Sequence, residues 1–95
     1  MIARMWEAHI NPGQLDAFCD WAQREAWPQF AAAGGFAGGE LYRSDEQHSA
    51  VVVTRWRDAD ALAAGNNWFD LGAERFCARE PNAWEFTPVP VGANP

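Results

Sequence analysis

The 95-residue sequence has two cysteines and no long apolar run, and each shortage excludes a class of protein. Cys19 and Cys77 form no C-x-x-C motif and have no cluster of histidines nearby, so neither a zinc site nor a redox pair is indicated. We expect two buried free thiols. The first residues lack the charged start and apolar centre of a signal peptide, and no segment approaches the length of a membrane span. These absences predict a cytoplasmic protein with no metal and no membrane partner.

Positive charge is also scarce. Seven lysines and arginines stand against 13 aspartates and glutamates, which gives a net charge of -6 and an isoelectric point near 4.6. Affinity for nucleic acid comes largely from basic side chains that displace counterions from phosphates. The charge balance therefore predicts no nucleic-acid partner.

Aromatic side chains are abundant, with six tryptophans and six phenylalanines. Such side chains dominate cores, interfaces and apolar ligand pockets alike, so composition alone does not separate these uses. A chain of this length is near the lower limit at which a single core suffices. We therefore expect one domain whose remaining apolar surface is covered by a second copy of the chain.

The first half of the chain predicts a strand, a helix and a hairpin. Residues 1–10 have apolar residues at both alternating positions, which indicates a central strand buried on both faces. Asn11 as cap and Pro12 as first residue start a helix that has a kink at Pro28 and ends at residues 34–35. "FAGGELYRS" and "HSAVVVTRW" form an antiparallel hairpin, with a bulge at residues 38–39.

The second half predicts two helical pieces and a last strand. Asp58 caps a piece that stops at Gly65, and Asn67 caps another that Pro81 closes. Residues 82–91 form the final strand, and residues 92–95 form a loose tail. The whole of residues 1–91 then reads as one α+β domain with the ferredoxin-like split βαβ order, in which helices cover one face of a four-stranded antiparallel sheet. We expect the uncovered, apolar face to pack against the same face of a second copy.

A resemblance to a known family rests on this order and on five segments. "ARMWEAHINPG", "GFAGGELYR", "VVVTRW" followed by "RDADALAA", and "AWEFTPV" together resemble the antibiotic biosynthesis monooxygenase family of dimeric α/β-barrel proteins, over residues 2–91. The resemblance implies an oxygenase without a cofactor that binds an aromatic substrate between helices and sheet, excludes water and stabilises a phenolate. Family oxygenases carry an asparagine four residues before a third-strand tryptophan and a tyrosine six residues after it. Trp56 matches the tryptophan, whereas Val52 and Leu62 stand at the other two positions.

A second branch of that resemblance degrades haem. It requires a histidine on the second helix and an asparagine on the first strand. Residues 58–80 contain no histidine, and the first-strand position falls at or beside Trp6. We do not expect haem degradation.

Four side chains are candidates for the wall of a ligand pocket. Trp56 is either a stacking wall for a flat ligand or a core tryptophan that closes the layer between helices and sheet. Trp27 beside the proline and Trp68 at the break between helical pieces are the other aromatic candidates. Asn66 is the candidate hydrogen-bond donor to a ligand carbonyl or phenolate.

Charged residues give two further predictions. His9 follows Glu7 on one face of the first strand, which is a general-base arrangement, so His9 is a weak catalytic candidate beside Asn66. Four charged residues come from four different strands, and we expect them to share the uncovered sheet face and to pair across the dimer interface: Arg4, Glu40, Arg55 and Glu85. The alternative is a polar pocket floor with Arg55 or Arg75 as anchor for an anionic substrate.

Two functions are compatible with these patterns. One is a homodimeric monooxygenase that holds a small apolar or aromatic molecule of quinone or phenol type, with no cofactor. The other is a non-enzymatic ligand-binding or interaction module of the same fold, which would be favoured if Trp27, Trp56 and Trp68 packed together without a cavity. An RNA-binding module of the same order would need a basic and aromatic signature that "SAVVVTRW" lacks.

Overall fold

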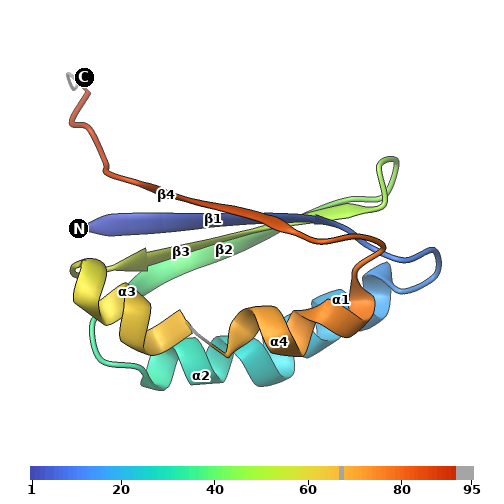
Figure 1. The fold of residues 1–95 in the computed structure, drawn as a ribbon, viewed down its shortest axis with the longest axis horizontal. Helices are drawn as coiled ribbons and strands as arrows, with labels where there is room; N and C mark the ends of the chain where they lie inside the picture. Colours follow the sequence, from blue (N-terminus) through green and yellow to red (C-terminus); the bar gives the residue numbers. More distant parts are fainter. Residues whose placement is uncertain (67, 92–95) are drawn as a thin grey trace.

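Four antiparallel strands form one sheet, and the helices cover a single face of it (Figure 1). The computed structural model describes residues 1–66 and 68–91, apart from the side chain of Asn66. The strands are β1 (Ile2–His9), β2 (Phe36–Ser44), β3 (Ser49–Trp56) and β4 (Asn82–Phe86), in the spatial order β2-β3-β1-β4. The predicted fold class is confirmed, with β1 and β3 in the centre and β2 and β4 at the edges.

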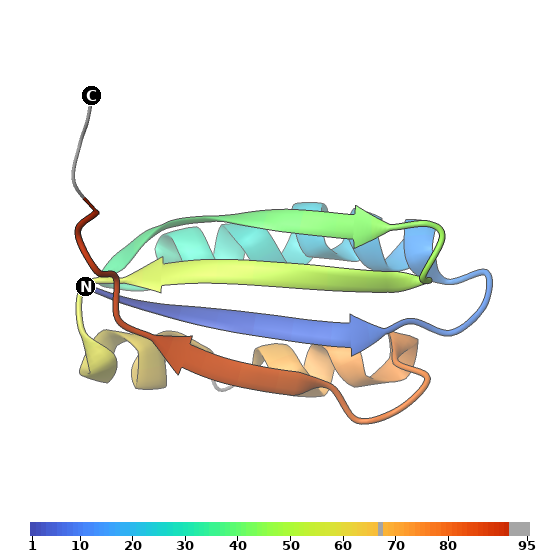
Figure 2. The ribbon, with the colours of Figure 1, turned by 90° about the horizontal axis from the view of Figure 1, so that it is seen from above.

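Strand register decides which side chains lie under the helices. Arg4 pairs with Thr54, Trp6 pairs with Val52, and residues paired directly across antiparallel strands point to the same face. Thr54, Trp6 and Val52 are buried, whereas Met5 between them is exposed on the other side. The strand β1 was expected to be buried on both faces, but within one subunit only its helix side is buried. Figure 2 looks onto the sheet, with the helices behind it.

The first helical segment begins later than the sequence predicts. It consists of α1 (Leu15–Trp21), a π-helical turn η1 (Ala22–Ala26) and α2 (Trp27–Ala32). The predicted start at Pro12 with Asn11 as cap is wrong, because Gly13 adopts a φ of +80° and the Asn11 carbonyl accepts the Gln14 N–H at 2.9 Å in a turn. The chain enters the helix only after this turn.

A π-helical turn lies just before Pro28, the position at which the sequence predicts a kink. In η1 the Trp27 N–H donates to the Ala22 carbonyl, five residues back, and Pro28 follows in the first turn of α2. Proline lacks the N–H that would continue the α-helical ladder, so the wide turn takes up the interruption. The helix is thereby shifted in phase before it reaches Phe30, which is fully buried.

The second helical region comprises α3 (Ala59–Asn66), α4 (Phe69–Ala73) and the 3-10 turn η2 (Glu74–Phe76). The predicted cap is confirmed, since the Asp58 carboxylate accepts the Ala61 N–H at 2.8 Å. That hydrogen bond, with a second one from Arg57, lowers the pKa of Asp58. The cap expected of Asn67 and the tail 92–95 lie outside the described residues.

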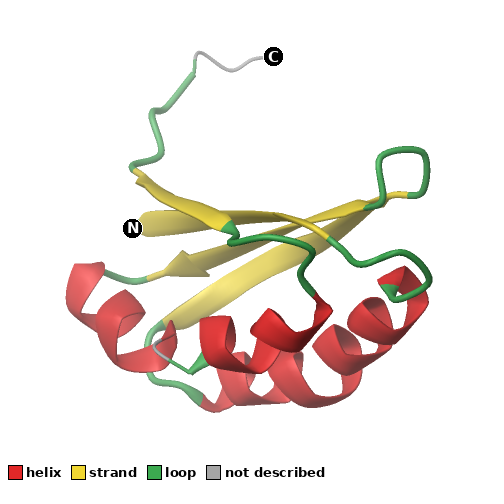
Figure 3. Ribbon diagram, turned by 45° about the vertical axis from the view of Figure 1, so that its right-hand side comes forward, coloured by secondary structure: helices red, strands yellow, loops and turns green. Residues whose placement is uncertain are grey.

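The hairpin and the last strand differ in how well they were predicted. The register between β2 and β3 shifts between Phe36 and Gly39, which confirms the bulge. The final strand ends at Phe86 and not at residue 91, and the following segment leaves the sheet (Figure 3). Pro88 and Pro90 lack the N–H that ladder pairing needs, which accounts for the shorter strand.

Aromatic rings fill the space between sheet and helices. Trp6 stacks on Phe18 at 5.5 Å and meets Phe69 edge-on at 5.2 Å. A side-chain carbon added at Gly65 would lie 2.4 Å from the Trp56 ring, so this helical glycine makes room for the indole. The core is therefore closely packed around Trp6 and Trp56.

Two further sequence predictions concern the cysteines and the absence of a membrane-spanning segment. Cys19 is buried and Cys77 is half-buried, both are free thiols, and burial raises the pKa of each. Within residues 1–66 and 68–91, no helix is long and apolar enough to cross a membrane.

Candidate functional site

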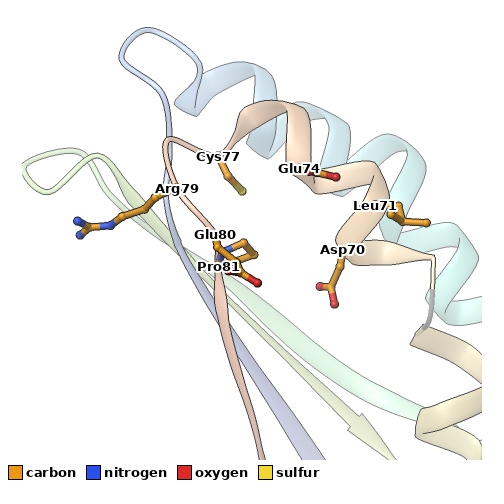
Figure 4. A pocket seen from close by; sticks show the side chains of 7 residues that line it. All are labelled: Asp70, Leu71, Glu74, Cys77, Arg79, Glu80 and Pro81. Carbon is orange, nitrogen blue, oxygen red and sulfur yellow. The ribbon is translucent and has the colours of Figure 1, made fainter.

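One cleft formed by the described residues lies between the α4–η2 segment and the loop that enters β4. Its volume is about 620 Å³, within the range of small-molecule pockets. Figure 4 shows the seven lining side chains, which come from both walls: Asp70, Leu71, Glu74, Cys77, Arg79, Glu80 and Pro81. The cleft opens at the β4 edge of the layer between helices and sheet, and the core residue Phe69 directly precedes the lining residue Asp70 in α4.

A smaller cleft of about 310 Å³ lies at the opposite edge, along β2. Its lining combines the first helical segment with the bulged strand: Gln23, Trp27, Gly39, Glu40 and Leu41. Trp27 is half-buried there and meets Phe30 edge-on at 5.7 Å. Trp27 thus lies on the wall of this smaller cleft, and its role in binding a ligand stays a prediction.

The three candidate tryptophans meet around one phenylalanine. The ring of Phe30 lies 5.7 Å from Trp27, 6.0 Å from Trp56 and 5.1 Å from Trp68. Trp56 is fully buried, and Trp68 donates its indole N–H to the Gly65 carbonyl at 3.1 Å. Phe30 fills the space between the three indoles, so each has a packing role independent of any ligand.

The positions that replace the family's polar residues are part of the same core. Val52 and Leu62 are both buried and offer no hydrogen-bonding group. The hydrogen-bonding role expected of Asn66 concerns a side chain outside the described part of the structure. His9 is exposed near the end of β1, on the same face as Glu7 and away from the helices.

Two buried donors stand out within the aromatic layer. Among the described residues, the indole nitrogens of Trp6 and Trp56 are buried and have no hydrogen-bond acceptor. A buried donor without an acceptor costs about 1–3 kcal/mol. An acceptor oxygen from a ligand would therefore be favoured in this layer.

The four strand charges do not share one face. Arg55 and Glu40 form a bidentate pair at 2.7 and 2.8 Å on the uncovered face, and these hydrogen bonds lower the pKa of Glu40 and raise that of Arg55. Arg4 is two residues from the buried Trp6 on β1, so its side chain points to the helix side. Glu85 lies directly opposite Arg4 on β4 and therefore points to the same side. The expected four-residue network is therefore wrong for Arg4 and Glu85.

The partner of Arg4 comes from a helix. Arg4 Nη2 lies 2.8 Å from Asp70 Oδ2, on the wall of the larger cleft. The side chain of Arg4 is 14% exposed and that of Asp70 is 49% exposed. Sequence reasoning missed this pair, although the alternation of Arg4 with Trp6 and Ala8 was a usable signal for its face.

The two arginines considered as anchors for an anionic substrate, Arg55 and Arg75, already interact with other groups of the protein. Arg55 is held by both oxygens of Glu40, while Arg75 lies 4.4 Å from the Phe76 ring centre and donates to the Gly72 carbonyl at 2.8 Å. In the described part of the chain, no group of three or more histidine, cysteine, aspartate or glutamate side chains is arranged to hold a metal.

The chain is similar to one known protein family and to several solved structures. The family model described as "Antibiotic biosynthesis monooxygenase" matches residues 1–67. No curated protein sequence matches the chain.

Solved structures of the same fold come from several bacteria. A putative antibiotic biosynthesis monooxygenase from Nitrosomonas europaea has a TM-score of 0.77 at 18% identity, covering 94% of this chain and 99% of its own. SnoaB from Streptomyces nogalater, described as a cofactor-independent oxygenase, has a TM-score of 0.78 at 20% identity, covering 95% and 94%. The monooxygenase ActVA-Orf6 of Streptomyces coelicolor, in complex with nanaomycin D, has a TM-score of 0.77 at 14% identity, covering 99% and 92%.

Proposed function

The chain belongs to the antibiotic biosynthesis monooxygenase family, and we propose that it is a homodimeric oxygenase of small aromatic substrates of quinone or phenol type. The observation that carries the proposal is the cleft of about 620 Å³ at the edge of the aromatic layer. A flat substrate in the cleft would contact the apolar lining residues Leu71, Cys77 and Pro81. Phe69 and Trp6 are each 1% exposed and would be reached only if the lining moved aside. The apolar lining side chains supply packing contacts, and the unpartnered indole N–H groups of Trp6 and Trp56 would supply donors to a carbonyl oxygen that entered the aromatic layer.

The proposed reaction needs no bound cofactor. A reduced aromatic such as 1,8-dihydroxyanthrone loses a proton and gives one electron pair at its reactive carbon to O2, which forms a C–O bond and a hydroperoxide. Loss of the second proton from that carbon then gives the second electron pair, which forms the carbonyl and breaks the O–O bond, and the outer oxygen atom leaves as water. The balanced change is anthrone plus O2 to anthraquinone plus H2O. The protein's contribution is to hold the substrate, keep water out and stabilise the oxyanion from which electrons pass to oxygen.

The uncovered sheet face supports the homodimer. Large apolar side chains are exposed on three of its strands: Met5, Tyr42, Trp84 and Phe86. Contiguous apolar patches of this kind mark interaction surfaces, and a self-complementary sheet face favours a two-fold dimer. The bidentate Glu40–Arg55 pair lies on the same face and would fix the register of the two sheets. A cytoplasmic location remains a prediction from the sequence.

Two observations favour the second candidate function, a non-enzymatic ligand-binding or interaction module. Trp27, Trp56 and Trp68 pack around Phe30, and the asparagine and tyrosine positions are apolar. Such a protein would bind an aromatic ligand without oxidising it.

Oxygen uptake separates the two functions. The purified protein is mixed with 1,8-dihydroxyanthrone in an oxygen electrode, and binding of 1,8-dihydroxyanthraquinone is followed by quenching of tryptophan fluorescence. Uptake above the rate without protein supports the oxygenase. Binding without added uptake supports the module, and absence of both removes both functions.

A further inference from the structure

Among the described residues, Arg4 is the more buried of two arginines whose ion pairs join the sheet to a helix, with 14% of its side chain exposed against 36% for Arg43, which reaches Asp16 of α1. Arg4 lies directly opposite Thr54 on β3, and this row of the sheet is flanked by Trp6 on one side and Trp56 on the other. Thr54 is the one buried polar residue of the described core. A polar row therefore crosses the sheet inside an otherwise aromatic layer.

The polar row has more donors than acceptors. Arginine and the tryptophan indole are donors only, and the indole nitrogens of Trp6 and Trp56 find no acceptor among the described residues. The carboxylate that reaches Arg4 is that of Asp70, which holds it through a single nitrogen at 2.8 Å. A ligand that fits this layer must bring acceptor oxygens, and its most favourable position is beside the guanidinium.

Asp70 also connects Arg4 to solvent. It is half-exposed on the wall of the larger cleft, whereas Arg4 lies behind it and is mostly buried. Figure 4 shows the Asp70 carboxylate directed into the gap between α4 and the segment that enters β4. A hydroxyl group that entered through the cleft would meet the carboxylate first and the guanidinium next.

We propose that Arg4 and Asp70 form the acid–base pair of the substrate site: Asp70 takes the proton of an aromatic hydroxyl group, and Arg4 binds the resulting oxyanion. The O–H bond of the ligand breaks, its electron pair stays on the ligand oxygen, and the proton passes to the Asp70 carboxylate and then to solvent. This inference rests on the proposed function and names its substrate class, a fused aromatic with an ionisable hydroxyl. It also supplies the polar groups that Val52 and Leu62 do not.

The charges around the cleft fit a substrate that arrives neutral. Glu74 and Glu80 line the same cleft as Asp70, with Arg79 as the cation on that lining. This excess of negative charge repels a ligand that is already ionised. A neutral hydroxyl group avoids that repulsion and gains the attraction of Arg4 only once it has lost its proton.

The test is an optical titration of 2-hydroxyanthraquinone, whose ionised form absorbs at longer wavelength. Bound to the wild-type protein, it should ionise at a lower pH than in buffer, with an ionisation constant about tenfold to hundredfold larger, the range that a hydrogen bond to a charged group provides. Arg4→Gln should remove this shift, and Arg4→Lys should restore part of it. Arg79→Gln, an equivalent change on the same cleft, should leave most of the shift in place.

The variant Asp70→Asn distinguishes the acid–base pair from a purely structural ion pair by the direction in which it changes the ionisation of the bound ligand. Removal of the carboxylate takes away the group that competes for Arg4, so the bound ligand should ionise at a still lower pH, while oxygen uptake with 1,8-dihydroxyanthrone should fall about a hundredfold as the proton acceptor is lost. A purely structural ion pair predicts that Arg4→Gln and Asp70→Asn have effects of the same sign. Because Asp70 is half-exposed, this variant decides the question even if Arg4→Gln does not fold.

Unsubstituted anthraquinone separates this inference from the proposed function. If the wild type and all variants bind it, and 2-hydroxyanthraquinone shows no shift in ionisation, the acid–base pair is wrong and the binding function stands. The acid–base pair is also wrong if the shift in ligand ionisation is still present in Arg4→Gln, or if it becomes smaller in Asp70→Asn. If neither quinone binds, the binding function fails and the acid–base pair fails with it.

Discussion

Single residues decide whether large rings fit between helix and sheet. Gly65 lies inside α3, where helix propensity alone favours alanine by about 1 kcal/mol. A side-chain carbon at this position would lie 2.4–2.5 Å from two atoms of the buried Trp56 ring. Steric overlap with a rigid indole outweighs the propensity term.

Gly65→Ala should therefore destabilise the protein, by about 1–3 kcal/mol in the free energy of unfolding measured with urea. Gly34→Ala is the matched control, because a side-chain carbon there would meet nothing within 4 Å. In a double-mutant cycle, Trp56→Phe should relieve part of the cost. A stabilised Gly65→Ala variant would show that the ring is not where the structure places it.

The cap of α3 gives a pH prediction. The pKa of Asp58 is lowered in the folded protein by the Ala61 N–H and by Arg57, so its stabilising contribution is present above the unfolded value of about 3.9. That contribution is lost as the pH falls through the lower, folded pKa. Asp58→Asn should be less stable than the wild type at neutral pH, and the difference should shrink at about pH 3. Urea midpoints at the two pH values test this; a constant difference would contradict the charge-based part of the cap.

At the scale of elements, the sequence predicted which helices and strands are present, and their order, better than it predicted where each one begins and ends. The Asp58 cap was clear because capping is a local signal. The helix start was misplaced because Gly13 adopts a positive φ that the Asn-Pro signal does not reveal. The π-helical turn at Ala22–Ala26 depends on how the helix packs, which no local signal encodes.

The junction of α3 and α4 is held by a tryptophan side chain. The Trp68 indole donates to the Gly65 carbonyl in the last turn of α3. Trp68→Phe keeps the ring but removes this donor, and should lower the free energy of unfolding by about 1 kcal/mol and speed amide exchange in the last turn of α3.

Trp27→Phe is the control for that variant, since Trp27 meets the same Phe30 ring from the edge of β2. It should leave amide exchange at the end of α3 unchanged. Equal exchange in both variants would mean that the indole hydrogen bond does not hold the junction.

At the scale of the whole molecule, the apolar sheet face predicts the assembly. Val53 lies on this face beside Met5, in the central pair of strands. Val53→Glu would place a charge in the middle of the dimer interface and should convert the dimer to monomer in size-exclusion chromatography with light scattering. Leu71→Glu, at an exposed leucine on the helix side, should leave the dimer intact. A wild-type monomer at micromolar concentration would contradict the dimer itself.

The site was harder to predict than the fold. The tryptophans singled out by the sequence have packing partners in the core, and the polar pair at the cleft joins residues 66 positions apart, Arg4 and Asp70. Arg4 and Asp70 can be placed together only when it is known which face of β1 packs against the helices. Alternation of Arg4 with apolar residues contained that information, but both alternating positions of β1 carry apolar side chains.

The central claim is that this chain oxidises an aromatic substrate with molecular oxygen. The most direct measurement is the rate of anthraquinone formation from 1,8-dihydroxyanthrone under ¹⁸O2, for the wild type and Asp70→Asn, each corrected for the reaction without protein. The account predicts a wild-type rate well above background, one ¹⁸O atom in each quinone, and a rate about a hundredfold lower in Asp70→Asn. A wild-type rate equal to the rate without protein would contradict it.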